Sequence, residues 1–449
     1  MLYAASPAPN AVPPIRSPHR LAPFALLLLT WACSSSATEH AVADTPAVVA
    51  ADPPRPASFD PAKAFDEFEQ TLRDSYAYLD RSDFDVDAHL ARTRAAALQL
   101  TDPLEFRRLL SRSTLAFTDP HLLVVPLDDA DPNVWPTSSD LALALDGERF
   151  VVADVRADSA ADAAGVRPGW TVRTINGAAI EARSAELLAN LVPAPTARQR
   201  IYAATLAING ARTGARVIEF VVDGQPRALE LANPRELAKT VAALAPLRLD
   251  IRDRVGIVRF NNSLDRQETV DAFDAAIRDC AGLDAMILDL RNTPSGGNTD
   301  VARAIIGHFV AEARPYQVHE IPLVLRRTSV PRRFIELALP RAPRFAGRVA
   351  VLGGRWTGSM GEGLVIGLHG AAGARTFASD MGDLLGAVDV LELPAAGISL
   401  ELGLESLFHV DGTPRADYVA DVPLPSADRN RDGHDPALLT ALAWLAAPP

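Results

Sequence analysis

The spacing of apolar residues divides the chain after residue 59 into blocks of different character. In residues 60–127 apolar residues recur three or four positions apart, as Phe65, Phe68 and Leu72 do, which is the period of an amphipathic helix. Residues 140–233 contain short runs in which apolar and polar residues alternate between turn residues, which is typical of strands. The pattern predicts an N-terminal helical region followed by a small β domain.

The block at residues 247–449 follows a different pattern, in which strand-like and helix-like runs succeed one another. Ala285–Leu290 and Val349–Leu352 are continuously apolar, as strands of a parallel sheet buried on both faces are. Each is followed by a glycine-bearing loop. Open α/β sheets place their chemistry at the carboxyl ends of such strands. We therefore predict an α/β core domain whose functional residues lie in these two loops.

The first residues predict an export signal, assigned to residues 1–37. A basic flank precedes the apolar run Leu21–Ala32, which is too short to span a membrane as a mature anchor. Two processing outcomes are open: a lipoprotein-type cleavage that leaves a lipid anchor on Cys33, or ordinary signal cleavage close to Ala37. Residues 38–59 are rich in Ala and Pro and are expected to form a tether. We expect the chain to be exported, to the periplasm or the outer cell envelope.

Composition narrows the choice of function. The formal net charge of −12 argues against nucleic acid as a partner, because binding it requires a basic surface. The 449 residues include two cysteines, Cys33 and Cys280, too few for a disulfide framework or a thiolate metal site. The motif DRNRDG copies half of a calcium loop, but Leu439 stands where the bidentate glutamate is due, and we expect no metal and no cofactor.

The loop after Val349–Leu352 reads GGRWTGSMGE and presents Ser359 where a strand turns into a helix. At a helix N-terminus the helix dipole and the free N–H groups can stabilise an oxyanion. The same spacing also fits a capping box, in which Ser359 caps the helix and Glu362 is its partner. The two interpretations are compatible. The second loop, LRNTPSGGN, carries Gly296 and Gly297, which allow backbone N–H groups to turn toward a site.

Residues 158–177 resemble a PDZ domain. The resemblance combines a helical turn, the Gly165-Val-Arg-Pro168-Gly169 corner and an Asn176-Gly177 hairpin in register. It implies that residues 140–233 capture an extended polypeptide by strand addition and control its entry to the active site.

The two core loops resemble those of another family. "LDLRNTPSGGN" resembles a glycine-rich segment, and "TGSMGEGLV" the nucleophile segment, of the C-terminal-processing (tail-specific) peptidases and their tricorn-core relatives. The resemblance implies a crotonase-like (ClpP/crotonase) α/β core with an inserted PDZ-like domain and an N-terminal helical region. It also implies a serine peptidase in which Ser359 attacks a polypeptide, with the N–H groups of Met360 and of Gly296 or Gly297 as oxyanion donors.

The base that activates the serine differs between branches of this family. One branch uses a lysine some two dozen residues after the serine, but the chain's two lysines are Lys63 and Lys239. The tricorn-like branch uses a histidine that precedes the PDZ domain. The segment TDPHLL resembles that branch and implies that His121 is the general base. With an unperturbed imidazole, activity would rise with pH around a midpoint near 6.5.

The carboxylate that would orient His121 is less clearly marked. The tricorn-like pattern places a glutamate at or beside Ala416. Asp417 is our assignment, with Glu401 and Glu405 as alternatives. The assigned catalytic set is therefore Ser359, His121, Glu362 and Asp417.

Two other classes of protein fit parts of the sequence. One is an α/β-hydrolase-type esterase that uses His409 or His434, although Thr357 breaks its Gly-x-Ser-x-Gly pattern. The other is a non-catalytic peptide-binding protein that keeps the peptidase fold. The leading prediction is an exported serine endopeptidase that cleaves extended or unfolded polypeptides. The resemblance to C-terminal-processing peptidases implies cleavage near their C-termini.

Overall fold

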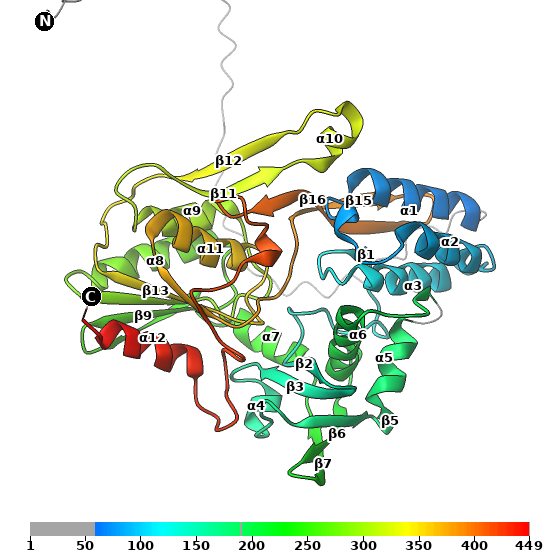
Figure 1. The fold of residues 1–449 in the computed structure, drawn as a ribbon, viewed down its shortest axis with the longest axis horizontal. Helices are drawn as coiled ribbons and strands as arrows, with labels where there is room; N and C mark the ends of the chain where they lie inside the picture. The colour runs from blue at the N-terminus through cyan, green and yellow to red at the C-terminus, as the bar shows by residue number, and fades with distance from the viewer. Residues whose placement is uncertain (1–58, 189–190, 449) are drawn as a thin grey trace, which may run out of the picture. The chain divides into compact units, whose positions relative to one another are not determined.

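The structure is a computed structural model that describes residues 59–188 and 191–448 (Figure 1). The predicted export signal, the tether and Cys33 lie outside the described residues. The predicted α/β class is confirmed, with helices and three sheets. Within the described part, no helix is both long enough and apolar enough to cross a bilayer.

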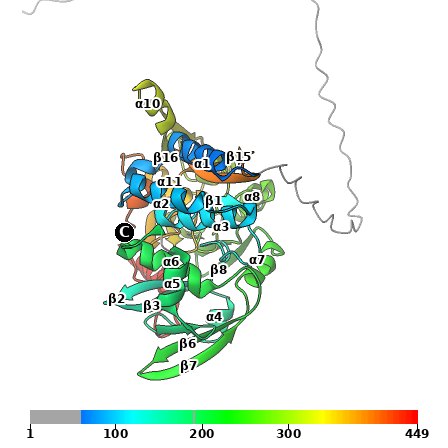
Figure 2. The same cartoon turned by 90° about the vertical axis from the view of Figure 1, so that its right-hand side faces the viewer.

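Three helices form the first block. The spacing of apolar residues predicts α1 and α3, whereas the buried face of α2 includes the polar residues His89 and Thr93. Asp60 and Asp102 accept hydrogen bonds from the first turns of α1 and α3, each of which carries a proline in that turn. The helices lie near strands β15 and β16 (Figure 2), and their buried residues belong to one apolar core with residues of these strands. The elements of this block are α1 (Pro61–Ser75), η1 (Leu79–Arg81), α2 (Val86–Ala97), α3 (Pro103–Thr114), η2 (Leu115–Phe117) and β1 (Leu123–Val125).

The second block is an antiparallel sheet in the order β2-β3-β4-β6-β7, with β5 paired to β4. Alternate residues of its strands point into an apolar core that α6 helps to close. The positive φ angles of Gly165 and Gly177 explain why glycines mark its turns. The elements are β2 (Leu141–Asp146), β3 (Arg149–Val155), α4 (Ala160–Ala163), β4 (Thr171–Ile175), β5 (Ala178–Ala179), α5 (Ile180–Leu188), α6 (Ala197–Asn209), β6 (Arg216–Val222), β7 (Gln225–Leu231) and α7 (Arg235–Ala242).

The third block contains the predicted core sheet, in the order β17-β14-β13-β10-β9-β8. All neighbours pair in parallel except β8 and β9. Strand β10 is buried throughout, as its continuous apolar run predicts. The elements are β8 (Leu247–Arg252), β9 (Val255–Phe260), α8 (Gln267–Asp279), β10 (Ala285–Asp289), α9 (Thr299–Gly307), β13 (Arg348–Gly353), α11 (Met360–Ala372), β14 (Arg375–Ala378), η4 (Arg415–Asp417), β17 (Val422–Pro423) and α12 (Pro436–Ala446).

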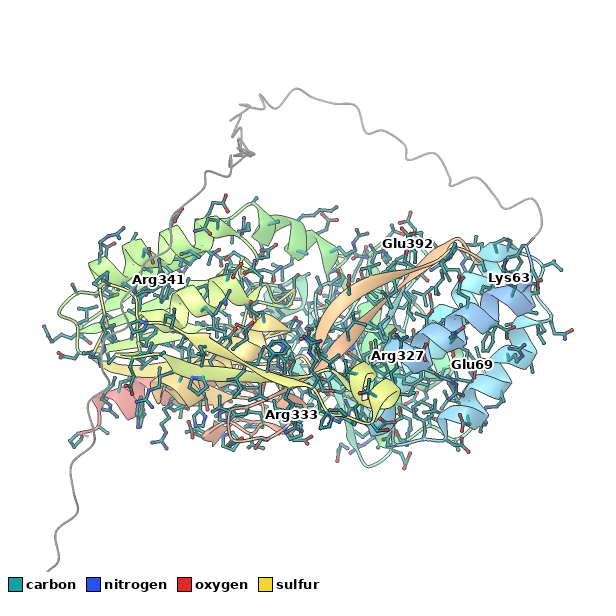
Figure 3. The ribbon with its side chains drawn as sticks, turned by 90° about the horizontal axis from the view of Figure 1, so that it is seen from above. Lys63, Glu69, Arg327, Arg333, Arg341 and Glu392 are labelled. Atoms are coloured by element: carbon teal, nitrogen blue, oxygen red, sulfur yellow. The ribbon has the colours of Figure 1, made fainter. Side chains whose placement is uncertain are left out.

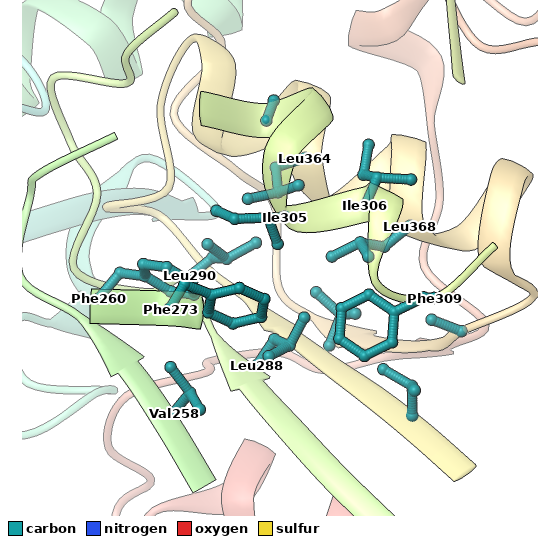
Figure 4. Close-up of a cluster of buried hydrophobic side chains, with 14 of the residues drawn as sticks. Val258, Phe260, Phe273, Leu288, Leu290, Ile305, Ile306, Phe309, Leu364 and Leu368 are labelled. Atoms are coloured by element: carbon teal, nitrogen blue, oxygen red, sulfur yellow. The ribbon is translucent and has the colours of Figure 1, made fainter. Parts of the chain in front are cut away.

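One face of this sheet packs against α8, α9 and α11. Phe260, Phe273 and Leu288 meet Ile305 and Leu364 in a cluster that excludes solvent (Figure 4). The free cysteine Cys280 is buried in the same cluster. This packing fixes the N-terminal ends of α9 and α11 at the carboxyl edge of the sheet, where both glycine-bearing loops lie.

A third sheet, which the sequence pattern does not predict, joins the N-terminal block to the core block. Its order is β1-β16-β11-β12, with β15 paired to β16. Strand β1 pairs antiparallel with β16, and Leu123 lies opposite Glu401. The further elements are β11 (Arg314–Glu320), α10 (Pro322–Thr328), β12 (Arg333–Ala338), β15 (Ala387–Leu393) and β16 (Ile398–Phe408). This pairing holds the segment that contains His121 beside residues of the core block.

Candidate active site

Ser359 lies at the sharp turn between β13 and α11. Its φ of 51° and ψ of −118° are unusual for a residue with a side chain. Strand β13 ends at Gly353, and Met360 is the first residue of the helix. The turn therefore presents the serine at the N-terminus of α11, where the helix dipole favours negative charge.

The two predicted loops lie against each other at this turn. The N–H of Thr293 donates to the carbonyl of Trp356 at 3.1 Å, and the N–H of Gly358 donates to the carbonyl of Thr293 at 3.1 Å. A Cβ atom on Gly296 would lie 2.4 Å from the Cβ of Ser359 and 2.7 Å from the backbone nitrogen of Met360. Only a glycine fits at position 296, and its lack of a side chain keeps the space in front of Met360 open.

Backbone donors at this point are candidates for an oxyanion hole. Within the described part of the chain, the N–H groups of Met360 and Gly297 donate no hydrogen bond. The N–H of Gly296, in contrast, donates to the carbonyl of Thr293 at 3.0 Å. The N–H of Ser359 is occupied by Glu362, at 3.0 Å. The geometry therefore favours Gly297 over Gly296 as the partner of Met360.

His121 follows η2 in a tight loop and is 5% exposed. Its Nδ1 lies 2.8 Å from the carbonyl oxygen of Leu385. A carbonyl can only accept a hydrogen bond, so Nδ1 carries the proton and the neutral ring presents an unprotonated Nε2. Burial lowers the pKa of His121 to about 4. The midpoint near 6.5 applies to an unperturbed imidazole, and burial of this ring moves the expected midpoint to lower pH.

The loop of His121 is itself held by a buried carboxylate. Asp119 accepts hydrogen bonds from the N–H of His121 at 2.9 Å and from the hydroxyl of Tyr76 at 2.9 Å. It also receives the N–H of Leu385 at 3.4 Å. Burial raises the pKa of Asp119 to about 7. Asp119 and Leu385 together fix the orientation of the imidazole. Asp119 belongs to the TDPHLL segment, which implied a role for His121 alone, and no motif included Leu385.

His121 and Ser359, which are 238 positions apart in the chain, line one cavity of about 400 Å³. Gly297 lines the same cavity, whereas Gly296 does not. Within the described residues, no hydrogen bond joins the Ser359 hydroxyl to the imidazole of His121. The structure thus brings together the predicted nucleophile, the predicted base and one predicted oxyanion donor around a space that a substrate could enter.

Glu362 acts on the backbone of the serine and does not line this cavity. One carboxylate oxygen receives the N–H of Ser359, and the other receives the N–H of Asp383 at 2.8 Å. Burial raises the pKa of Glu362 to about 8, although the guanidinium of Arg415 lies nearby and lowers it in part. In this geometry Glu362 contacts the serine through its backbone N–H, and its place in the catalytic set stays a prediction.

Arg415 contacts the backbone of Ser359 on its carbonyl side. Its buried guanidinium donates to the carbonyl of Ser359 at 3.0 Å and to the side chain of Gln317. Gln317 in turn lies 2.7 Å from Nε2 of His319, whose Nδ1 lies 2.6 Å from Glu405. This chain of buried polar groups runs from β16 to the backbone of Ser359. The family pattern suggested a glutamate near Ala416, so nothing in the sequence pointed to an arginine with this role.

The predicted orienting carboxylates lie in three different places. Asp417 forms an exposed ion pair with Arg81 at 3.1 Å, and the structure does not bring it to His121. Glu405 is engaged by His319. Glu401 lines the cavity of Ser359, and burial raises its pKa. Because Leu385 already occupies Nδ1, a backbone carbonyl takes the place that our assignment gave to Asp417.

The residues of the competing mechanisms lie elsewhere. Lys63 is exposed on α1 (Figure 3), and Lys239 pairs with Glu236 at 2.8 Å on the surface. His409 contacts His369 in the last turn of α11, at the opposite end of the helix from Ser359. None of these residues lines the cavity that holds His121 and Ser359. The geometry favours neither a Ser–Lys dyad nor an esterase that uses His409.

His434 and the calcium-like motif belong to a loop before α12. The side-chain oxygen of Asn430 accepts the N–H groups of Asp432 and His434, which closes the loop on itself. Within the described residues, no group of three or more histidine, cysteine, aspartate or glutamate side chains could hold a metal ion. The motif is therefore a turn in this structure.

The edge of the predicted PDZ-like domain is partly occupied by its own helix. The N–H of Leu141 lies 3.3 Å from the side-chain oxygen of Asn209, and the N–H of Leu143 lies 3.2 Å from the hydroxyl of Thr205. Both partners lie on α6. A peptide that added to the start of β2 would have to displace these contacts first.

Comparison with known proteins adds a likeness of fold. A scan against models of protein families gives no match, and neither does a search of curated proteins. Among solved structures, mature CPAF superposes with a TM-score of 0.57 at 13% identity, covering 86% of this chain and 95% of that one. The photosystem II D1 C-terminal processing protease superposes with a TM-score of 0.51 at 14% identity, covering 82% and 94%. At these identities the likeness concerns the mixed α/β fold alone, and the crotonase-like core and the PDZ-like insertion stay predictions.

Proposed function

We propose that this chain is an exported serine endopeptidase that cleaves extended or unfolded polypeptides. The observation that carries the proposal is the cavity in which His121, Ser359 and Gly297 meet although they come from distant parts of the chain. The fold shared with the D1 C-terminal processing protease and CPAF supports the same class.

In the proposed reaction, Nε2 of His121 accepts the proton of the Ser359 hydroxyl while the oxygen attacks the scissile carbonyl. The N–H groups of Met360 and Gly297 donate to the oxyanion at the N-terminus of α11. The imidazolium then returns the proton to the leaving amine, and an acyl-enzyme remains. A water molecule, deprotonated by the same imidazole, hydrolyses the acyl-enzyme and restores Ser359.

A fluorophosphonate probe tests the nucleophile. We expect it to label the wild-type protein, to label His121→Ala far more slowly and not to label Ser359→Ala. Ser295→Ala is the matched control, because Ser295 lines the same cavity. The probe should label this variant as it labels the wild-type protein. Labelling that survives Ser359→Ala would reject the assignment of the nucleophile.

A non-catalytic peptide-binding protein is the second candidate. Two observations favour it: no hydrogen bond joins His121 to Ser359 in the described residues, and no carboxylate contacts the imidazole. Cleavage of a reduced, unfolded protein separates the candidates. A protein that binds this substrate without cleaving it, and that resists the probe, would be the binding protein.

Residues 140–233 are proposed to bind the polypeptide as a PDZ-like domain does. Their removal should reduce cleavage of long unfolded substrates more than cleavage of short peptides. An equal loss on both would show that the domain serves only the stability of the enzyme.

A further inference from the structure

The carbonyl of Ser359 and the N–H of Met360 belong to one peptide unit. Such a unit is planar and trans, so a contact that fixes the carbonyl also fixes the direction of the N–H. The guanidinium of Arg415 donates to this carbonyl at 3.0 Å. Arg415 therefore sets the direction of the N–H that the proposed mechanism uses as an oxyanion donor.

The hydrogen bonds beyond Arg415 have one possible direction. A guanidinium only donates, so the side-chain oxygen of Gln317 faces Arg415 and its NH2 group faces Nε2 of His319, at 2.7 Å. Nε2 must then accept, which leaves the ring proton on Nδ1 and directs it to the carboxylate of Glu405, at 2.6 Å. Glu405 thus selects the tautomer of His319 that Gln317 and Arg415 require.

Packing encloses these groups on two sides. His319 is 3% exposed, and its ring stacks on that of Phe334 with the ring centroids 4.4 Å apart. On the side of α11, a Cβ atom at Gly363 would lie 2.6 Å from Nη2 of Arg415 and 2.9 Å from Oε1 of Gln317. These close contacts leave little room for Gln317 and Arg415 to move independently of each other.

We propose that Glu405 and His319 are positioning residues of the oxyanion hole. Through Gln317 and Arg415 they hold the peptide unit that carries the N–H of Met360. Hydrogen bonds in such a chain polarise one another, which strengthens the last donor. The proposal rests on the proposed peptidase function, because it assigns a role to residues around that same nucleophile. Glu405 then serves the oxyanion side of the site, whereas the family resemblance offered it as a carboxylate for the histidine base.

Two substitutions of Glu405 separate its hydrogen bond from its charge. Glu405→Gln keeps an oxygen that accepts from Nδ1 of His319 and should retain most of kcat. Glu405→Leu has no acceptor, so the ring proton is free to move to Nε2, where it opposes the NH2 group of Gln317. We expect Glu405→Leu to lower kcat for a quenched peptide by about tenfold with KM little changed, which is less than the roughly hundredfold loss on removing an oxyanion donor itself. Glu392→Leu, at an exposed carboxylate, is the control and should not change kcat.

The N–H of Met360 is observed directly after incorporation of ¹⁵N-labelled methionine, because the chain has four methionines. Met360→Leu assigns its signal by removing it. Glu405→Leu should shift the signal of Met360 and leave in place that of Met286, which is buried in the core. Glu405→Gln should move neither signal. If Glu405→Leu does not fold, Gln317→Leu interrupts the same chain of hydrogen bonds at its middle and takes its place.

The two measurements together decide the proposal. A shifted Met360 signal with a lowered kcat in Glu405→Leu, and neither change in Glu405→Gln, would support it. A Met360 signal that stays in place, an unchanged kcat, or equal changes in both variants would overturn it while the wild-type activity stands. If the wild-type protein neither reacts with fluorophosphonate nor cleaves an unfolded protein, the peptidase assignment fails. The Met360 signal then still shows whether Glu405 holds this peptide unit.

Discussion

The loops that carry Ser359 and His121 meet in one cavity, but they are held there by different kinds of contact. Ser359 depends on elements that are consecutive in the chain: β13, the turn and α11. His121 depends on Leu385, which is 264 positions away, and on the pairing of β1 with β16. Ser359, the proposed nucleophile, is presented by a local turn that contacts Arg415 and Gly296, whereas His121, the proposed base, depends mainly on tertiary contacts.

This difference determines how each region should respond to change. The strand–turn–helix unit of Ser359 is fixed by the buried core beneath α11, so we expect the serine to be displaced by changes at the turn or at residues that touch it, such as Gly296 and Arg415. The imidazole of His121 is fixed by hydrogen bonds across two loops. Changes far from His121 in the sequence can therefore alter its orientation or its pKa.

Loss of either reacting group should give the largest effect. We expect Ser359→Ala and His121→Ala each to lower kcat by about 10⁴-fold or more, and the double variant to be little worse, because the two residues act as a unit. Steady-state cleavage of a quenched peptide provides the measurement. Lys239→Ala is the control and should retain activity. A His121→Ala variant with most of its activity would reject the mechanism.

The next largest effect is expected at Gly296, where the two glycine-bearing loops touch. In Gly296→Ala the new Cβ would lie 2.4 Å from the Cβ of Ser359, which forces the turn to move. A displacement of about 1 Å in a catalytic group can cost about a hundredfold in rate, and we expect a loss of that order. Its measure is kcat/KM on a short peptide.

Gly282→Ala is the matched control for this substitution. Gly282 also has a positive φ, of 80°, but a Cβ atom there meets nothing within 4 Å. It should share the conformational cost, about 1 kcal/mol in the free energy of unfolding, without the loss of rate. Equal losses of rate in the two variants would show that the contact with Ser359 is unimportant.

The regions differ equally in how far the sequence predicts them. Strand β10, strand β13 and helix α11 follow from apolar runs and from local turn signals, and the structure contains all three. The third sheet, which contains β1 and β16, cannot be predicted in this way. The pairing of β1 with β16 joins residues about 275 positions apart and leaves no periodic signal in either segment.

Within the site, the same division holds. The serine and the glycines could be found from their loops. The partner of the imidazole could not, because a backbone carbonyl such as that of Leu385 has no sequence signature. Arg415 could not be found either, since its role depends on burial beside Ser359 and Gln317. Asp417 is assigned from the family pattern. In the structure it lies on the surface, paired with Arg81, and does not contact His121.

Arg415 offers a test on the serine side of the comparison. Arg415→Gln removes a buried guanidinium from the carbonyl of Ser359 and takes away the positive charge that lowers the pKa of Glu362. We expect a loss of about 3 kcal/mol in the free energy of unfolding, because hydrogen bonds from a buried charged donor are lost, and a loss of about tenfold or more in kcat with KM little changed. Arg332→Gln, at an exposed arginine, is the control for charge.

The pH dependence of the activity tests the environment of His121. In the proposed mechanism His121 acts as a base only when it is neutral, and burial lowers its pKa to about 4. Activity should therefore stay high as the pH falls from 6 to 5 and decrease by about tenfold per unit below pH 4. Activity should be measured by brief exposure at each pH, with refolded controls. A midpoint near 6.5 would show that the imidazole is more exposed to solvent than in this structure.

A change in activity centred near pH 7 would arise from a group other than His121. Burial raises the pKa of Asp119 to about 7, and its carboxylate holds the backbone of His121. Asp119→Asn keeps the size of the side chain and removes the titration. If a step near pH 7 disappears in this variant while the step near pH 4 remains, the two titrations belong to Asp119 and His121 respectively.

The smallest effect is expected at Asp417, where a substitution tests whether this carboxylate takes any part in orienting His121. Asp417 is the carboxylate that the sequence pattern assigns to the histidine, but in the structure it pairs with Arg81 on the surface. Exposed ion pairs contribute about 0–1 kcal/mol, so Asp417→Asn should change the free energy of unfolding by less than that and kcat/KM by less than about twofold. Glu401→Gln, at a residue that lines the cavity, should have the larger effect on kcat/KM. A tenfold or greater loss in Asp417→Asn alone would mean that Asp417 reaches His121 during catalysis, and that tertiary contacts other than the carbonyl of Leu385 orient the base.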